Sequence, residues 1–160
     1  MSHSVVIRTQ TVRTESTAIV INTGYLKTWS GILKFLQLAL GIVCVGIIGD
    51  QFKPGYYRTT TDLFFFLVVT TFMIGTFILL LSCLCSLSTS SIISKTIYEL
   101  FYHSIAFGLV LSAALSLLVQ INKTNDRNYE LLLGAAICGL VNSALYLFST
   151  IIALRSYRGI

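Results

Sequence analysis

The longest apolar stretch of the chain runs from Leu63 to Leu87 and contains no charge, no proline and one glycine, Gly75. A helix rises about 1.5 Å per residue, so about 20 apolar residues cross the roughly 30 Å hydrocarbon core of a bilayer. A core helix of a soluble protein is rarely this long and apolar on every side. The stretch therefore predicts a membrane-spanning helix.

Three further windows have the same character and a similar length. They run from Ser30 to Gly49, from Ile97 to Ile121 and from Leu131 to Leu154. Four spans leave little of the 160 residues for anything else. The pattern therefore predicts an all-α protein, an integral membrane four-helix bundle with one four-span domain at 25–155. We expect a disordered cytoplasmic tail at 1–24 and a short cytoplasmic tail at 156–160.

The distribution of charge orients this bundle. Only 11% of the residues are charged, and the formal net charge is +5. With an even number of spans, both ends and the 88–96 connection lie on one side of the membrane. That side carries Arg8, Arg13, Lys27, Lys34, Lys95, Arg155 and Arg158 against Glu15 and Glu99, whereas basic and acidic residues balance on the other side. Lysine and arginine resist translocation, so we expect cytoplasmic termini. Topology and anionic lipid explain the positive charge, which argues against a nucleic-acid partner.

Two titratable residues near the start of the third span are candidates for chemistry. Glu99 and His103 are four residues apart, so they share one helical face just inside the cytoplasmic boundary. A metal or proton site would need more ligands, and no Asp, second His or loop Cys is near in sequence. The simpler interpretation is structural: the two residues satisfy each other, Lys95 or backbone groups. Glu99 still needs a partner, because an acid at this depth is costly when unpaired.

Gln37, Asn142 and Lys34 are further candidates within the spans. Gln37 and Asn142 lie deep in the first and fourth spans, and we expect interhelical hydrogen bonds from them rather than ligands for transport. Lys34 lies about one turn inside the first span, where its long side chain can extend outward to water.

Small residues recur along the last two spans. The third span carries four at strict four-residue spacing, and the fourth carries a matching ladder: Ser104, Gly108, Ser112 and Ser116, then Ala135, Gly139 and Ser143. Helices in lipid associate where small side chains let their backbones approach. The two ladders therefore predict a packing seam.

The first external loop, 50–62, has thirteen residues and no cysteine, which excludes a disulfide-stapled extracellular head. Cys83 and Cys85 lie near the cytoplasmic end of the second span, where reversible palmitoylation competes with a plain packing role. Cys44 and Cys138 are expected to pack rather than to bridge. Asn122 begins a glycosylation sequon that lies nearly flush with the membrane, so we expect no glycan there.

Three stretches carry a family resemblance: the first span, GILKFLQLALGIVCVGIIGD; the third, YELFYHSIAFGLVLSAALSLL; and the close of the chain, AAICGLVNSALYLFSTIIALRSYR. The first resembles the opening helix of the MARVEL domain, and the other two are similar to the same family. Within that family the chain resembles the chemokine-like-factor branch and plasmolipin-type proteins. The resemblance covers about residues 25–158. It implies a four-helix membrane bundle with cytoplasmic termini and roles in vesicle trafficking, membrane apposition or cell junctions. It carries over no catalytic residues.

These observations favour a non-enzymatic tetraspan membrane protein that organises membrane lipids and other membrane proteins in vesicle trafficking, membrane apposition or fusion, or cell junctions. We expect it in the plasma membrane or endomembrane vesicles, without a cofactor, and a homo-oligomer is compatible with the sequence. The alternative is an ion channel or transporter, alone or as an accessory subunit, with a path lined by Gln37, Glu99, His103 and Asn142. A membrane enzyme is disfavoured, since the sequence shows no nucleophile–base pair, phosphate loop or metal cluster.

Overall fold

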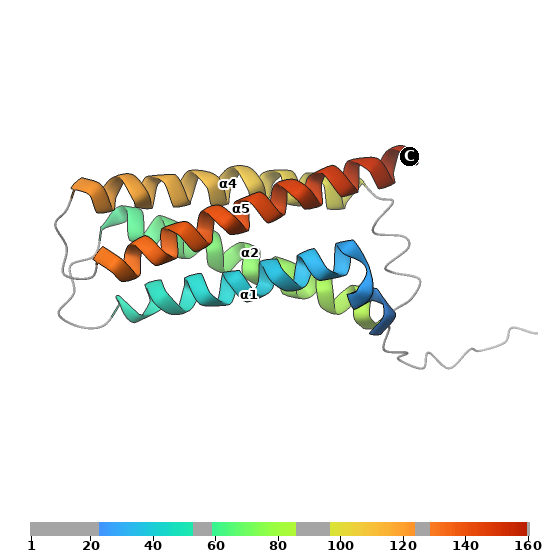
Figure 1. The fold of residues 1–160 in the computed structure, drawn as a ribbon, viewed down its shortest axis with the longest axis horizontal. Helices are drawn as coiled ribbons and strands as arrows, with labels where there is room; N and C mark the ends of the chain where they lie inside the picture. Colours follow the sequence, from blue (N-terminus) through green and yellow to red (C-terminus); the bar gives the residue numbers. More distant parts are fainter. Residues whose placement is uncertain (1–22, 53–58, 86–96, 124–128, 160) are drawn as a thin grey trace, which may run out of the picture.

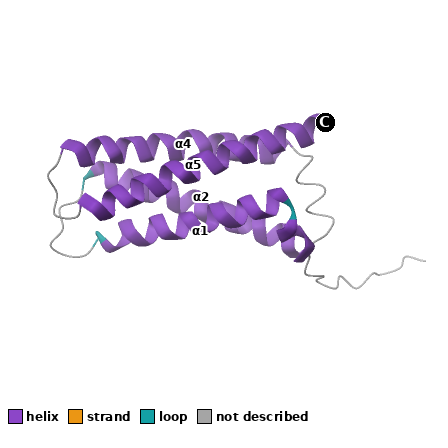
Figure 2. Cartoon of the chain, viewed as in Figure 1, coloured by secondary structure: helices purple, strands orange, loops and turns teal. Residues whose placement is uncertain are grey.

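The computed structural model describes residues 23–52, 59–85, 97–123 and 129–159. These ranges contain a short 3-10 helix, η1 (Thr23–Lys27), and four long α-helices (Figure 1): α1 (Trp29–Asp50), α2 (Thr60–Cys85), α4 (Ile97–Lys123) and α5 (Tyr129–Arg158). Each long helix is apolar enough to cross a membrane. The predicted all-α four-span bundle is therefore confirmed, and in Figure 2 the described residues are helix apart from short loop stretches at helix ends.

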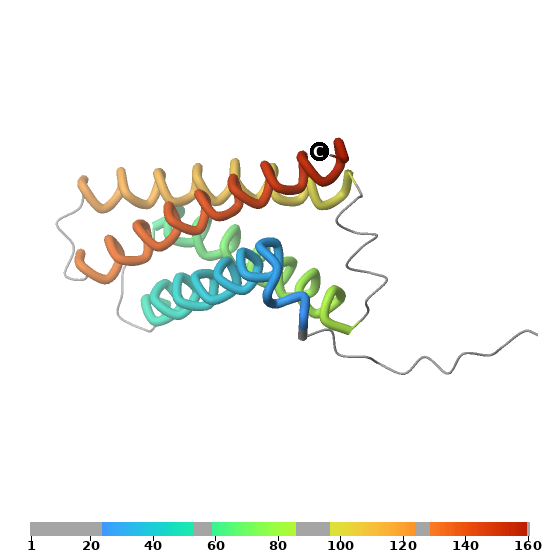
Figure 3. The backbone as a smooth tube through the Cα atoms, turned by 45° about the vertical axis from the view of Figure 1, so that its right-hand side comes forward, coloured from blue at the N-terminus to red at the C-terminus, as the bar shows by residue number. Residues whose placement is uncertain are grey.

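The long helices run alternately in opposite directions, so η1, the start of α4 and the end of α5 lie at the same end of the bundle (Figure 1). We refer to it as the terminal end. Helix α1 packs against α2 and α5, and α4 packs against the same two helices. Helices α1 and α4 therefore face each other diagonally across the bundle, as do α2 and α5. The tube in Figure 3 shows α4 and α5, the most extensively packed pair, running alongside each other.

Side-chain caps set where two of the helices begin. Thr28 caps α1, because its Oγ1 accepts a hydrogen bond of 3.1 Å from the backbone N–H of Gly31. Before α2, Thr59 and Asp62 cap each other: the Asp62 N–H donates to Thr59 Oγ1 at 3.2 Å, and the Thr59 N–H donates to Asp62 Oδ2 at 3.0 Å. These bonds stabilise a polar first turn, and α2 consequently starts before the predicted apolar window.

The ends of the chain differ from the expected boundaries. Residues 23 and 24, expected in the tail, belong to η1, whereas residues 1–22 lie outside the described residues. Helix α5 continues to Arg158, so most of the tail expected at 156–160 is helical. Arg155 and Arg158 stand in its last turn, where positive charge interacts favourably with the helix dipole. Gly159, with φ of 71°, then ends the helix.

The interior changes from apolar to polar along the bundle axis. Away from the terminal end, buried apolar side chains fill it: Cys44, Ile48, Phe65, Val69, Ala113, Ala114, Leu117, Ile121, Leu132, Ala135 and Ala136. Toward the terminal end, the buried set includes Lys34, Gln37, Thr76, Glu99, His103 and Ser149. The outer surface carries large apolar side chains on all four long helices. This distribution suits a bundle whose solvent is lipid, where polar groups must find partners inside.

Candidate functional site

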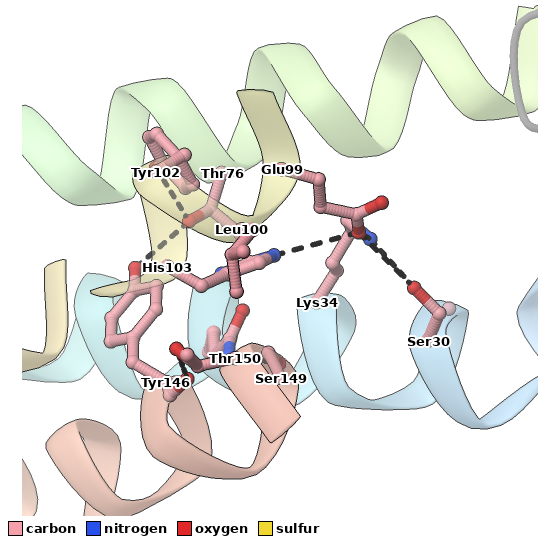
Figure 4. A network of polar contacts seen from close by, with 12 residues as sticks. Ser30, Lys34, Thr76, Glu99, Leu100, Tyr102, His103, Tyr146, Ser149 and Thr150 are labelled. Carbon is pink, nitrogen blue, oxygen red and sulfur yellow. Dashed lines mark hydrogen bonds and ion pairs between the residues drawn. The ribbon is translucent and has the colours of Figure 1, made fainter. Parts of the chain in front are cut away.

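A cluster of polar side chains occupies the interior near the terminal end, and we refer to it as the polar cluster (Figure 4). All four long helices contribute to it: Lys34 and Gln37 from α1, Thr76 from α2, Glu99, Tyr102 and His103 from α4, and Tyr146 and Ser149 from α5. The exposed fraction is 1% for Lys34, 4% for Glu99 and 0% for His103. Ionisable groups this deep in a membrane bundle are expensive unless they are paired, which makes them candidates for function.

An ion pair between Lys34 and Glu99 is the centre of the polar cluster, and it joins the diagonally opposed helices α1 and α4. Lys34 Nζ also donates to Ser30 Oγ at 2.7 Å and to Tyr25 OH at 3.0 Å, so each of its three protons has an acceptor. Ser30 Oγ lies 3.5 Å from the same carboxylate oxygen, Glu99 Oε1. The expectation that Lys34 extends outward to water is therefore wrong, because a carboxylate across the bundle provides a nearer partner.

Tyr25 covers this ion pair from the terminal end. Helix η1 turns the side chain inward until only 8% is exposed, against Leu80 and Cys83 of α2. The centroid of its ring lies 5.8 Å from Lys34 Nζ, within cation–π range. Burial raises the pKa of Tyr25 above its ordinary value, so the hydroxyl stays protonated at neutral pH. Glycine at position 31 permits this turn, because a Cβ there would clash with the carbonyl oxygen of Tyr25.

His103 lies one turn further along α4 than Glu99. Its Nε2 is 3.6 Å from Glu99 Oε1, which is within ion-pair range but too long for a hydrogen bond. Its ring centroid lies 5.2 Å from that of Tyr102 and 5.9 Å from that of Tyr146. Among the described residues, neither imidazole nitrogen has a hydrogen-bond partner. The structure thus places Glu99 and His103 side by side, as the spacing suggested, but the nearest partner of the Glu99 carboxylate is Lys34. Lys95, the other suggested partner, lies outside the described residues.

A second set of hydrogen bonds continues the polar cluster toward the middle of the bundle. Thr76 Oγ1 of α2 lies 2.8 Å from the hydroxyl of Tyr146 and 3.0 Å from that of Tyr102. The Tyr102 hydroxyl also donates to the carbonyl of Phe72 at 3.0 Å. Sequence reasoning missed these hydroxyl groups, which look like ordinary apolar-span residues when each helix is read separately.

The two amide side chains singled out from the sequence are both buried, and they differ in their bonding. Gln37 Nε2 of α1 donates to Ser149 Oγ of α5 at 2.8 Å, an interhelical hydrogen bond of the expected kind. Asn142 lies in the interior of α5. Within the described part of the chain, Gln37 Oε1 and Asn142 Oδ1 accept no hydrogen bond.

The small-residue ladder of α5 faces the interior. Ala135, Gly139 and Ser143 are all buried. A Cβ at position 139 would lie 2.8 Å from Phe65 Cε2 and 3.1 Å from Ala114 Cβ. Glycine at this position therefore lets α5 approach the side chains of α2 and α4 closely.

The ladder of α4 is placed differently. Gly108, Ser112 and Ser116 are exposed, Ser104 is half-buried, and a Cβ at Gly108 would meet nothing within 4 Å. The expected contribution of this ladder to a seam within the bundle is therefore wrong. Ser104 and Ser112 donate to carbonyls of their own helix at 2.8 Å and 2.7 Å, so their hydroxyls need no neighbour. Helix α4 instead packs through Glu99, His103, Ala106, Val110, Ala113, Ala114, Leu117 and Ile121.

The cysteines are free thiols in different surroundings. Of the two candidates for palmitoylation, Cys83 is buried against Tyr25, and Cys85 is exposed at the end of α2. The thiol of Cys44 is buried and lies 3.7 Å from the carbonyl oxygen of Ala135, while Cys138 is half-buried. Asn122, the sequon residue, is exposed in the last turn of α4.

The chemistry available to the polar cluster is electrostatic. Among the described residues, no group of three or more His, Cys, Asp and Glu side chains is arranged to hold a metal ion. What the polar cluster offers is one carboxylate between a lysine ammonium and an imidazole, a set that can hold charges in place and exchange a proton.

Comparison with known families gives a match over residues 25–152 to MARVEL, described as a membrane-associating domain. Comparison with curated proteins and with solved structures found no match. The matched range contains α1, α2 and α4 and reaches into α5, and it includes every member of the polar cluster. With four helices of membrane-spanning length in its described part, the chain is a multi-pass integral membrane protein. It belongs to the MARVEL family of membrane-associating domains.

Proposed function

We propose that this protein is a non-enzymatic tetraspan organiser of membrane lipids and partner membrane proteins, acting in vesicle trafficking, membrane apposition or fusion, or cell junctions. The observation that carries the proposal is the distribution of polarity. Lys34 and Glu99 form an ion pair inside the bundle, while large apolar side chains cover its outer faces. Such faces meet acyl chains and other spanning helices, with which they associate by packing.

Features of the outer surface near the terminal end support contact with lipid. Trp29 is 77% exposed at the start of α1, a position that suits the headgroup region of a bilayer. An apolar hollow of about 250 Å³ is formed by residues of η1 and the first turns of α1, and part of an acyl chain would fit in it. The hollow is lined by Leu26, Ile32, Phe35 and Leu36.

We further propose that the terminal end faces the cytoplasm, in the plasma membrane or in endomembrane vesicles. Lys34 and Glu99 neutralise each other in the interior, and removing both from the charge count leaves the positive excess on that side unchanged. Lysine and arginine flanking the spans favour the cytoplasmic face.

Site-specific photo-crosslinking in native membranes tests the organising role. A photoreactive phenylalanine analogue is placed at Phe101 or Phe148, which point outward, and at Phe65, which is buried, as the matched control. We expect discrete adducts with other membrane proteins, or with a second copy of the chain, from the outward positions. Phe65 should give only crosslinks within the chain. If the outward positions capture bulk lipid alone, the organising role is wrong.

The alternative, a channel or transporter subunit, is favoured by one observation: Gln37, Glu99, His103 and Asn142 all lie in the interior. The apolar packing of the other half of the bundle argues for a filled interior instead. We expect proteoliposomes containing the protein to pass no more ions than empty ones. Ion flux that is abolished by Glu99→Gln would support the alternative.

A further inference from the structure

We propose that Glu99 and His103 form a proton-binding site inside the bundle, and that proton binding releases the η1 strap, residues Thr23–Lys27, from the polar cluster. This site is independent of the proposed organising function. It rests on the contacts of the polar cluster, on the packing of Tyr25 over them, and on the burial of both groups.

One carboxylate oxygen of Glu99 lies near three polar neighbours (Figure 4). Glu99 Oε1 is paired with Lys34 Nζ, and it lies 3.5 Å from Ser30 Oγ and 3.6 Å from His103 Nε2. While Lys34 occupies that oxygen, the carboxylate charge is compensated and the imidazole stays beyond hydrogen-bond distance. A protonated imidazole in an apolar interior needs an anionic partner within reach. Proton binding to His103 therefore competes with Lys34 for Glu99.

Proton binding changes the net charge of the buried ionisable groups. A proton from water at the terminal end binds to Nε2 of His103, the carboxylate of Glu99 stays ionised, and Lys34 stays an ammonium group. The net charge of these three groups rises from zero to one positive charge. An uncompensated charge is costly in this interior, and a lysine near a helix end can carry its charge outward along its flexible stem. Lys34 is therefore the group that moves.

The titratable and charged groups around His103 come from every neighbouring element. Helix α4 supplies Glu99 and Tyr102, α1 supplies Lys34, and α5 supplies Tyr146; η1 supplies Tyr25, and α2 supplies Cys83 beneath it. The hydroxyls of Tyr102 and Tyr146 are engaged by Thr76. Of these residue types, histidine ordinarily gains its charge between about pH 5 and about pH 8.

Lys34 is hydrogen-bonded directly to the η1 strap. Lys34 Nζ donates to the Tyr25 hydroxyl at 3.0 Å, and Tyr25 packs in one cluster with Leu80 and Cys83, which is 1% exposed. When Lys34 leaves the interior, Tyr25 loses this charge-assisted hydrogen bond and the cation beside its ring. Release of Tyr25 uncovers the Cys83 thiol. Cys83 is thus a native reporter of the strap, and Cys85, exposed at the end of the same helix, is its reference.

The experiment combines a titration with thiol labelling on the full chain in lipid nanodiscs, from about pH 8 to about pH 5. The chain has two histidines, His3 and His103, so a His3→Gln sample assigns the imidazole signals in NMR spectra. The labelling rate of Cys83 is measured in Cys85→Ser protein, and that of Cys85 in Cys83→Ser protein, each read at its own residue by peptide mass spectrometry because Cys44 and Cys138 are also free thiols. The ratio of the two rates corrects for the effect of pH on thiol reactivity. We expect His103 to bind a proton, and the labelling ratio to rise about 5- to 150-fold over the same pH range.

A His103→Gln variant is the matched control, because glutamine keeps a polar side chain of similar reach but binds no proton in this range. Its labelling ratio should stay low throughout. The proposal is overturned if His103 does not titrate in the parent, or if the ratio rises equally in His103→Gln. Titration of His103 with a constant ratio overturns the coupling to η1. The NMR titration uses the native site, so the test stands even where the variant folds poorly.

Discussion

Lys34 and Glu99 show how two charges are retained inside a bundle whose solvent is lipid. Each would be costly alone, and each is hydrogen-bonded as well as paired. The sequence offered a signal for this pair, since both residues stand within the first two turns of helices that start at the terminal end. Lys34 was instead expected to reach water, because one helix considered alone shows no partner. The pairing depends on which helices lie diagonally opposite, and hydropathy carries no information about that.

Removing one member of this pair should destabilise the protein more than removing both. We expect Lys34→Met to lower the free energy of unfolding by about 3–5 kcal/mol, because it leaves the Glu99 carboxylate buried and unpaired. The double variant Lys34→Met, Glu99→Gln should lower the free energy of unfolding clearly less than Lys34→Met does. Equilibrium unfolding in bicelles measures both, with Lys27→Met, an exposed lysine at the end of η1, as the control. A double variant that lowers the free energy of unfolding as much as Lys34→Met alone, or more, would contradict this account.

At the scale of the helices, number, type and approximate bounds were predictable because the bilayer sets a minimum apolar length. The remaining differences come from local chemistry at helix ends. The Thr59 and Asp62 capping box was present in the sequence, and it begins α2 before the apolar window. Arg158 and Gly159 end α5 beyond the expected span, because a basic last turn and a left-handed glycine favour that end point.

The faces through which these helices pack were not predictable from hydropathy. A helix that is apolar all round presents lipid-compatible residues on every side, so its sequence does not mark an inner face. The spacing of small residues predicted an inner face on both α4 and α5. In the structure the ladder of α5 is buried and that of α4 is largely exposed. The buried side of α4 is marked instead by Glu99, His103, Ala106 and Val110, which repeat at helical spacing. In this chain, the titratable residues Glu99 and His103 indicate the inner face of α4 better than its serines do.

Two matched glycine substitutions test the packing of α5 and α4. Gly139→Leu should destabilise the bundle by more than about 2 kcal/mol, because even its Cβ would overlap Phe65 and must displace an aromatic ring in a filled core. Gly108→Leu should change stability by less than about 0.5 kcal/mol, since its side chain enters open space at the outer surface. Unfolding and yield of folded protein measure both variants. Equal behaviour of the two would show that α5 does not pack as described.

At the scale of the whole molecule, polarity is arranged along the bundle axis as well as across it. The half away from the terminal end is held by apolar packing, whereas the other half is held by hydrogen bonds and one ion pair that link all four helices. A polar half has fewer dispersion contacts and depends on the protonation state of its members, so it is the half in which a conformational change can be controlled. Both ends of the described chain lie beside that half (Figure 1).

This asymmetry makes the orientation of the bundle the most informative property of the whole molecule to measure. We expect epitope tags at both ends, and the exposed thiol of Cys85, to react with membrane-impermeant reagents only after the plasma membrane is permeabilised. In cells that carry the protein in the plasma membrane, a thiol introduced at Asn122, at the opposite end of the bundle, should react without permeabilisation and serves as the matched control. Ends on opposite faces would contradict the four-span fold itself. Both ends outside would keep the fold and reverse the orientation, so that the polar cluster and its strap would respond to the pH of the exterior or of the vesicle lumen.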